Sequence, residues 1–191
     1  MISKDKALGL LKKYIKTENT VKHMLATEAI MRALAQCFEP DKEEEWALAG
    51  LLHDIDYETI PQDTKAGHGK VSVEILQREK ADLPQSVLDT IHAHCFNLYP
   101  EFEPKNKMEW SLFICDSLTG LITAVALVRP SKKIAEVKLK SIRKKFKQPS
   151  FAAGTRRDEI AMCEEKLNIS LDKFILLSLT AMQGISTELG L

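Results

Sequence analysis

Apolar side chains recur along the chain at the three- and four-residue spacing of an amphipathic α-helix, and no segment alternates as a β-strand does. The pattern predicts helices over residues 3–15, 20–38, 41–53, 68–76, 84–96, 108–128, 131–146 and 170–185, with one more beginning near residue 155. Proline and glycine interrupt the pattern at Pro61, Gly67 and Pro130. The chain is therefore expected to be an all-α protein.

At 191 residues the chain is long enough for one sizeable hydrophobic core. Hydrophobic residues make up 45% and charged residues 28%, which is typical of soluble globular proteins. The candidate functional side chains lie within residues 1–129, and the chain becomes basic and amphipathic after residue 130. We expect a functional core over 1–129 and a helical extension over 130–191 that packs on this core and is not an independent domain.

Charge and cysteine content bear on partners and compartment. The formal net charge is zero, so no overall field attracts nucleic acid. The chain opens with a charged amphipathic helix rather than a signal peptide, and its four cysteines form no CxxC pair. The apolar run 112–128 is short for a membrane span and contains Asp116, which favours a buried core helix. These features predict a cytoplasmic protein without a membrane partner.

A histidine and an aspartate stand side by side, as His53 and Asp54, where a strongly apolar helix ends. Burying a carboxylate is costly unless it is paired or bound to a cation. A neutral imidazole and a carboxylate are both good ligands for a divalent transition ion. The doublet therefore indicates a metal site.

His23 and His68 are weaker candidates when each is taken alone. His23 lies on the apolar stripe of the second predicted helix, where a histidine is more often a hydrogen-bonded core residue than a ligand. His68 stands between two glycines at a predicted helix start, which leaves its ring accessible to a partner. A capping or surface role for His68 is equally compatible with this position.

Asp116 lies in the middle of the most apolar predicted helix, where an unpaired carboxylate would be protonated or would disrupt the site. Thr119 and Thr123 continue its stripe over about 10 Å of helix axis. Such a polar line suits the floor of a pocket. Two interpretations of Asp116 stay open: a metal ligand, or a buried ion pair with an arginine or lysine.

His92 and His94 compete for one place in the site. Because they are two residues apart on a predicted helix, they face roughly opposite directions. His94 shares a face with Val87 and Ile91, whereas His92 shares one with Leu88. Helical periodicity does not decide between them.

The order of these residues resembles that of the HD-domain metal-dependent phosphohydrolases. Two segments resemble the second and third motifs of that family: GLLHDI over residues 50–55 and GHGKVSVEIL over residues 67–76. The resemblance covers about residues 20–125. In the family, the next histidine follows an isoleucine by three residues, which favours His94 over His92.

The resemblance implies an all-helical bundle around a central metal site. The residues that it implies as ligands of one ion are His23, His53, Asp54 and Asp116. A second ion, if present, would be held by His68 and His94.

The chain departs from the family pattern in two places. Many members follow the His-Asp pair with Ile-Gly-Lys, whereas Asp56 and Tyr57 replace the last two residues here. A lysine that could act on phosphate is therefore missing. Members with two ions often have His-His where this chain has His94-Cys95. Cys95 is either a soft ligand or a core thiol, and the number of ions stays open.

Together these features predict a metal-dependent phosphohydrolase that cleaves a phosphoester or phosphoanhydride of a nucleotide or another small phosphorylated metabolite. An ion of Mn, Fe, Co, Ni, Zn or Mg would activate a water and polarise a phosphoryl oxygen. The expected catalytic residues are Asp54, His68 and His94, and the expected substrate-binding residues are Lys70, Thr119, Thr123 and Arg129. The alternative is a non-catalytic regulatory module that binds a metal or nucleotide, which the missing lysine favours.

The basic run over residues 131–147 is interpreted as a solvated helix face. A nucleic-acid contact is the competing interpretation, but the run lacks the interleaved aromatic side chains that stack on single-stranded bases. We expect a small phosphorylated substrate and no nucleic-acid or membrane partner. A homodimer is compatible with the sequence.

Overall fold

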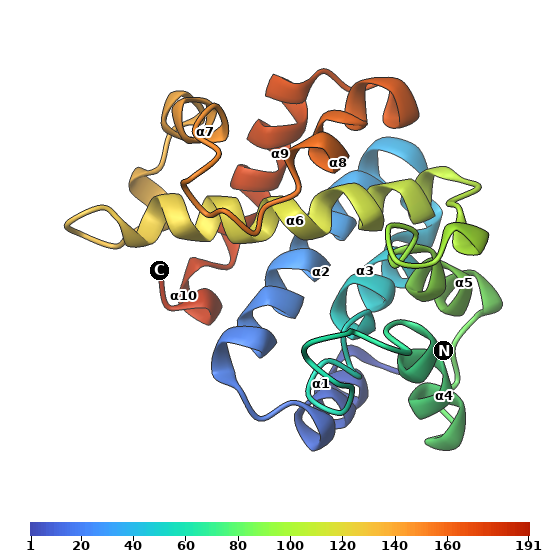
Figure 1. Ribbon diagram of the computed structural model, residues 1–191. Coiled ribbons are helices and arrows are strands. Elements are labelled where there is room, and N and C mark those ends of the chain that lie inside the picture. Colours follow the sequence, from blue (N-terminus) through green and yellow to red (C-terminus); the bar gives the residue numbers. More distant parts are fainter.

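The computed structural model describes residues 1–191 and contains helices but no strand (Figure 1). The α-helices are α1 Lys4–Tyr14, α2 Glu18–Phe38, α3 Glu43–Leu52, α4 Lys70–Arg78, α5 Gln85–Ala93, α6 Lys107–Leu127, α7 Leu139–Phe146, α8 Arg157–Ala161, α9 Leu171–Gly184 and α10 Ser186–Leu189. Short 3₁₀ turns at Pro40–Lys42, Pro100–Phe102 and Ile134–Glu136 and a π-helical turn at Cys163–Leu167 complete the chain. The all-α prediction is confirmed.

The two longest helices, α2 and α6, form the centre of the fold, and α6 crosses the middle of the molecule in Figure 1. α2 packs against α3, α6 and α9, and α6 also packs against α5, α7 and α8. Their buried faces belong to one hydrophobic cluster of 42 side chains. Because each large aliphatic side chain in it contributes about 1.5–3 kcal/mol on burial, this cluster is the main source of stability.

α6 is the one helix long and apolar enough to cross a membrane by length and composition. In the structure, 67% of its most apolar 18-residue window is buried inside the protein. Leu118, Leu121 and Ile122 are fully covered by neighbouring helices. α6 is therefore a core helix, as its polar residues predict.

The C-terminal region, residues 130–191, contributes side chains to the same core. Ile134, Ile142 and Phe174 are fully buried in the common cluster. α9 packs on α2 and α6, and α8 packs on α6 (Figure 1). This packing places the segment just before α8 over the middle of α6, where Asp116 lies.

The helix predicted over residues 131–146 is wrong in its first half. The chain forms a 3₁₀ turn at Ile134–Glu136, is extended at Val137, and enters α7 only afterwards. The side-chain amide of Gln183, in α9, donates through Nε2 to the carbonyl oxygens of Ile134 and Val137 at 3.0 and 3.2 Å. Because α9 holds these carbonyls and the buried side chains of the segment, tertiary contacts rather than the helical pattern set its backbone conformation.

Two helix boundaries near the candidate site also differ from the prediction. α4 begins at Lys70 rather than near His68, because Gly69 has a left-handed φ of +76°. α5 ends at Ala93, about one turn earlier than predicted. His68 and His94 therefore lie in turns next to helices rather than inside them.

Candidate metal centre

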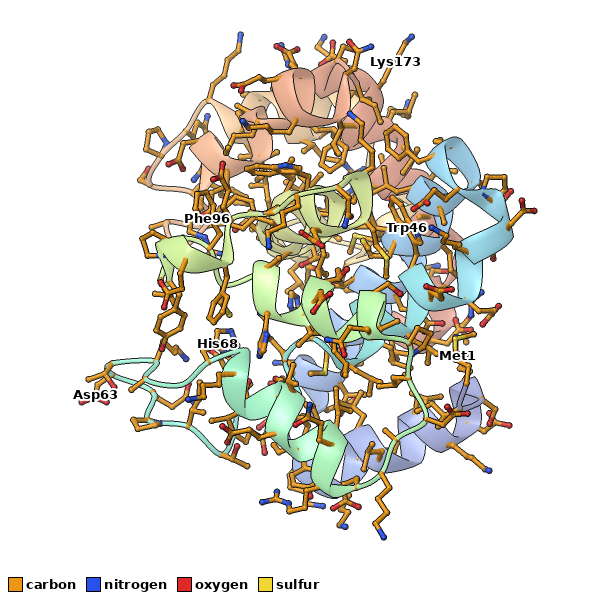
Figure 2. All side chains as sticks on the ribbon, turned by 90° about the vertical axis from the view of Figure 1, so that its right-hand side faces the viewer. Met1, Trp46, Asp63, His68, Phe96 and Lys173 are labelled. Atoms are coloured by element: carbon orange, nitrogen blue, oxygen red, sulfur yellow. The ribbon has the colours of Figure 1, made fainter.

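Six side chains singled out from the sequence meet at one place in the fold. They are His23 from α2, His53 and Asp54 from the turn after α3, His68 from the loop before α4, His94 from the turn after α5, and Asp116 from α6. Figure 2 labels His68 where the loop that carries Asp63 turns into α4. The cluster thus joins five segments that are far apart in the chain.

A glycine allows α2 and α3 to approach closely enough to bring two of these histidines together. A Cβ atom at Gly50 would lie 2.9 Å from the carbonyl oxygen of Thr27 and 3.0 Å from the Cα of Glu28. Any side chain at this position would push the two helices apart. His53 follows Gly50 by three residues and His23 precedes Thr27 by one turn, so this contact sets their separation.

One side of the cluster combines two imidazoles with a carboxylate. Nε2 of His23 lies 3.0 Å from Oδ1 of Asp116 and 3.2 Å from Nε2 of His53. Nε2 of His53 lies 3.7 Å from the same oxygen of Asp116. Three potential ligand atoms, from α2, α6 and the turn after α3, therefore lie within 4.8 Å of one another.

Asp54 connects this side of the cluster to the other. Its Oδ1 lies 3.5 Å from Nε2 of His53, 3.2 Å from Nε2 of His68 and 3.3 Å from Nε2 of His94. The Nε2 atoms of His68 and His94 are 3.3 Å apart. Its other oxygen, Oδ2, lies 3.8 Å from Nε2 of His23. All four imidazoles thus surround this one carboxylate.

The structure distinguishes His94 from His92. Nε2 of His94 belongs to the cluster. The ring of His92 stacks on Phe102 instead, with ring centroids 5.0 Å apart and an interplanar angle of 16°. His92 also lines a separate cavity with Phe102. The family pattern, rather than helical periodicity, pointed to the histidine that joins the cluster.

Backbone carbonyl groups bind the Nδ1 atoms of His53 and His94, the ring nitrogens that face away from the cluster. Nδ1 of His53 donates to the carbonyl oxygen of Gly50 at 2.9 Å, and Nδ1 of His94 donates to the carbonyl oxygen of Ile91. Because a carbonyl can only accept, Nδ1 carries the proton when either ring is neutral. This leaves the Nε2 lone pair directed into the cluster, which is the arrangement that a metal ligand needs.

Thr119 orients the ring of His23 in a similar way. The threonine hydroxyl donates to the carbonyl oxygen of Asp116 at 2.7 Å, so it accepts from Nδ1 of His23 at 2.9 Å. Nε2 of His23 is then free to act as a ligand. Thr119, expected from the sequence to bind substrate, thus also supports a candidate metal ligand.

Asp56 holds the fourth ring, and the sequence did not suggest this role. Its carboxylate is fully buried and accepts from Nδ1 of His68 at 2.9 Å. It also accepts from the backbone N–H groups of Gly69 at 2.8 Å and Ser72 at 3.1 Å. The residue that departs from the family's Gly therefore fixes His68 and ties the start of α4 to the metal centre. No local sequence signal could have shown this, because its partners are 12 to 16 residues away.

Asp116 makes the ion pair that was the alternative to a ligand role, and it also faces the cluster. Its Oδ2 accepts from Nη2 of Arg156 at 3.1 Å, while its Oδ1 lies toward His23. Nε of Arg156 donates to the buried carboxylate of Glu159 at 2.5 Å. Arg156 comes from the C-terminal region and was not among the residues expected at the site.

The opposite charges in the cluster oppose the effect of burial on the pKa values of its carboxylates and imidazoles. Burial disfavours the charged form of Asp54, but the surrounding imidazoles prevail and hold the pKa of its carboxyl well below the usual range. Burial likewise lowers the pKa of His94, yet Cys95 and Asp54 together raise this pKa to about 10. For His68, the hydrogen bonds to Asp54 and Asp56 outweigh burial and raise the pKa of the ring. A cation that binds these rings must therefore displace protons.

Cys95 lies beside the histidines, and the structure keeps both sequence interpretations open for it. Its Sγ is buried and lies 3.4 Å from Nε2 of His94. Burial raises the pKa of this thiol, but the neighbouring His94 and His68 outweigh burial and lower it. Gly69 makes room for the sulfur, because a Cβ there would come within 2.7 Å of Sγ.

A cavity of about 530 Å³ opens beside the cluster. It is lined by His23, Asp54 and Asp116, by further residues of α2 and α6, and by the segment 152–156 before α8. A second cavity of about 340 Å³ shares His23 and Thr119 with the first and continues along α6 past Thr123. The candidate ligands are therefore accessible to a small molecule.

The two cations expected from the sequence to bind phosphate do not line either cavity. Lys70 is exposed at the start of α4. Arg129 lies just beyond the end of α6 and pairs with Glu136 at 3.3 Å. Of the four residues expected to bind substrate, the structure places only Thr119 and Thr123 at the cavities.

The donor set fits a divalent ion. Ligands held about 2.1 Å from an ion and at right angles to each other are about 3.0 Å apart. The spacing between Nε2 of His23 and its neighbours Asp116 and His53, 3.0 and 3.2 Å, matches this value. The groups whose ligand atoms lie within 4.8 Å of one another are His23–His53–Asp116, His53–Asp54–His94 and His68–His94–Cys95. Imidazole and carboxylate ligands suit Mn, Fe, Co, Ni or Zn.

Comparison with known proteins agrees with this geometry. The profile of the HD domain matches residues 20–121, which is more than half of the chain and includes all six candidate ligands. Neither the curated proteins nor the solved structures contain a significant match. The chain therefore belongs to the HD-domain family, whose members generally are metal-dependent hydrolases.

Proposed function

We propose that the protein is a metal-dependent phosphohydrolase that cleaves a phosphoester or phosphoanhydride of a small phosphorylated metabolite, with nucleotides as the first class to test. The observation that supports this most is the convergence of four Nε2 atoms on Asp54 and Asp116 beside a cavity of about 530 Å³. Membership of the HD-domain family supports the same class of reaction.

Each residue has a proposed role that follows from its position in the cluster. A divalent ion held by His23, His53, Asp54 and Asp116 would activate a water and polarise a phosphoryl oxygen. The carboxylate of Asp54 is placed to accept the proton of that water, with Nε2 of His68 and His94 at 3.2 and 3.3 Å from its Oδ1. Because Asp56 and Ile91 hold their Nδ1 atoms, these two rings exchange protons with the site only at Nε2.

The test measures phosphate release from a panel of nucleotides after chelation of metals and reloading with Mn²⁺. We expect release to depend on the ion, and Asp54→Ala to lower the rate at least about 100-fold. Asp63→Ala is the matched control, because Asp63 is an exposed carboxylate in the loop before α4. Normal turnover by Asp54→Ala would refute the catalytic assignment.

A second candidate is a regulatory module that binds a metal and a nucleotide without hydrolysis. The replacement of the family's Gly-Lys by Asp56 and Tyr57 favours it, since Asp56 is used here to hold His68. Calorimetric binding of nucleotides to protein loaded with several different ions separates the two candidates. Binding without product under every ion would favour the regulatory module.

We also propose a cytoplasmic protein whose partner is a small phosphorylated molecule rather than nucleic acid. α7 exposes basic side chains such as Lys140 and Lys144, consistent with a solvated helix face. Binding of single- and double-stranded oligonucleotides at low salt tests this. Salt-dependent binding that is lost in Lys144→Gln/Lys145→Gln would contradict it.

A further inference from the structure

The proposed substrate is an anion, yet the larger cavity is lined by two carboxylates, Asp54 and Asp116. A phosphate monoester carries about −1.5 to −2 charge at neutral pH, so it needs cations nearby. Among the 14 residues that line this cavity, Arg156 is the only arginine or lysine. The lysine that many family members have after the His-Asp pair is replaced by Tyr57.

We propose that Arg156 binds a non-bridging oxygen of the substrate's phosphoryl group and thereby forms a phosphate subsite supplied by the C-terminal region. This inference rests on the proposed function, because it concerns the substrate of the same site. Arg156 lies outside residues 20–121, which match the HD domain. The subsite is therefore a feature of this chain in addition to the shared metal centre.

The side chain of Arg156 is held in place by two carboxylates. Its Nε donates to Oε2 of Glu159 at 2.5 Å, and its Nη2 donates to Oδ2 of Asp116 at 3.1 Å. A guanidinium has five N–H donors, and these two bonds use two of them. Because 41% of the side chain is exposed and the residue lines the cavity, the remaining donors are available to a bound anion.

The position next to Asp116 also suits the reaction geometry. Oδ1 of Asp116 lies 3.0 Å from Nε2 of His23, so a ligand of Arg156 is adjacent to the metal centre. A planar guanidinium pairs with two phosphoryl oxygens at once, whereas a lysine ammonium acts as a point charge. Glu159 fixes the Nε edge of the guanidinium, so little further ordering is needed when an anion binds.

Calorimetry on the Mn²⁺-loaded protein, with inorganic phosphate as the probe, tests this subsite. We expect Arg156→Gln to raise the dissociation constant of phosphate about 10- to 100-fold, the usual effect of losing a hydrogen bond to a charged group. Arg156→Lys should raise it less. Arg143→Gln is the matched control, because Arg143 lies in the same C-terminal region, pairs with Asp172 at 2.9 Å and does not line the cavity.

The Mn²⁺ affinity of each variant, measured without phosphate, separates two roles of Arg156. An unchanged Mn²⁺ affinity together with weaker phosphate binding supports the subsite. A parallel loss of Mn²⁺ affinity overturns it, because Arg156 would then be a positioning residue for Asp116. If Arg156→Gln does not fold, as judged by circular dichroism, Arg156→Lys carries the test, and unchanged phosphate affinity in that variant overturns the proposal.

Phosphate binding and phosphate release together distinguish a failure of the subsite from a failure of the proposed function. If the wild-type protein binds phosphate and Arg156→Gln binds it equally well, only the subsite is overturned. If the wild-type protein loaded with Mn²⁺ binds no phosphate, the subsite is overturned, and phosphate release from the nucleotide panel decides separately whether the proposed function holds.

Discussion

The candidate metal centre has two halves that are built in different ways and share Asp54. The helical half consists of His23, His53 and Asp116, and the loop half consists of His68, His94 and Cys95. The helical half is carried by α2, α6 and the end of α3, which pack closely in the core. The loop half is carried by turns that precede α4 and follow α5.

The difference indicates separate roles for the halves. The helical half has its own carboxylate, Asp116, in addition to the shared Asp54, so it offers the nitrogen and oxygen ligands that a first ion needs. The loop half has no carboxylate of its own facing the cluster, because Asp56 is used to hold the ring of His68 from behind. We infer that the first ion binds at the helical half, and that the loop half either completes a second site or transfers protons.

Removing one candidate ligand from each half tests most directly whether the two halves contribute differently to metal binding. We expect His23→Ala to lower the affinity for Mn²⁺ at least about 100-fold. A residue that binds the ion directly contributes more to affinity than a residue that only hydrogen-bonds to a ligand. His94→Ala should keep one ion per chain. Elemental analysis of the dialysed proteins measures the ion content. Loss of all metal in both variants would show that the two halves form a single site.

The buried carboxylate of Asp56 should stabilise the loop half in particular. Asp56→Ala leaves the N–H groups of Gly69 and Ser72 buried without an acceptor, which costs about 1–3 kcal/mol for each group. We expect the free energy of unfolding to fall by about 2–6 kcal/mol in urea titrations. Asp63→Ala, in an exposed loop, should change it little. An effect of Asp56→Ala as small as that of the control would contradict the role assigned to these hydrogen bonds.

Two glycines allow each half to be perturbed separately. Gly50→Ala places a Cβ 2.9 Å from a backbone oxygen of α2, and Gly69→Ala places one 2.7 Å from Sγ of Cys95 at a φ of +76°. Each should cost about 1–3 kcal/mol of stability. Gly50→Ala should also weaken binding of the first ion, whereas Gly69→Ala should not.

A third glycine offers a control for these variants. A Cβ at Gly120, inside α6, meets no atom within 4 Å. Gly120→Ala should therefore stabilise the protein by about 0.5–1 kcal/mol. Thermal unfolding with and without Mn²⁺ measures both effects, and equal loss of ion binding in Gly50→Ala and Gly69→Ala would remove the distinction between the halves.

The protonation of the imidazoles predicts how metal binding depends on pH. The pKa of His94 is raised to about 10. Burial lowers the pKa of His23, but the hydrogen bond to Asp116 and the charges of Asp116 and Asp54 together outweigh burial and raise it. Each ring that becomes a ligand must lose its proton, so Mn²⁺ affinity should rise with pH, by up to about tenfold per pH unit for each proton displaced. Titrations between pH 6 and pH 8, roughly the range in which Mn²⁺ stays soluble, measure this slope. A pH-independent affinity would contradict the raised pKa values.

The same shifts affect the metal-free protein with the opposite sign. A raised pKa in the folded state contributes stability that is fully present below the unfolded pKa of about 6.5. For His94 this contribution is lost as the pH rises toward about 10. Metal-free protein should therefore lose stability with rising pH over the range in which metal binding becomes stronger.

The helical class and most of the candidate ligands could be predicted from the chain alone. Helical periodicity depends on neighbours three and four residues away, so it is visible in any window of the sequence. His53 and Asp54 at the end of an apolar helix, and Asp116 within another, are local contradictions of that pattern. Such contradictions point to chemistry because a buried charge requires a partner.

Other features depended on which distant groups meet in the folded chain. Arg156 pairs with Asp116 across 40 residues, and Gln183 breaks the predicted helix at Ile134 across 49. Asp56 acquires its role from N–H groups 13 and 16 residues away. Hydrogen bonds over such separations leave no periodic trace in a sequence, because they are set by how the helices pack and not by the residues beside them.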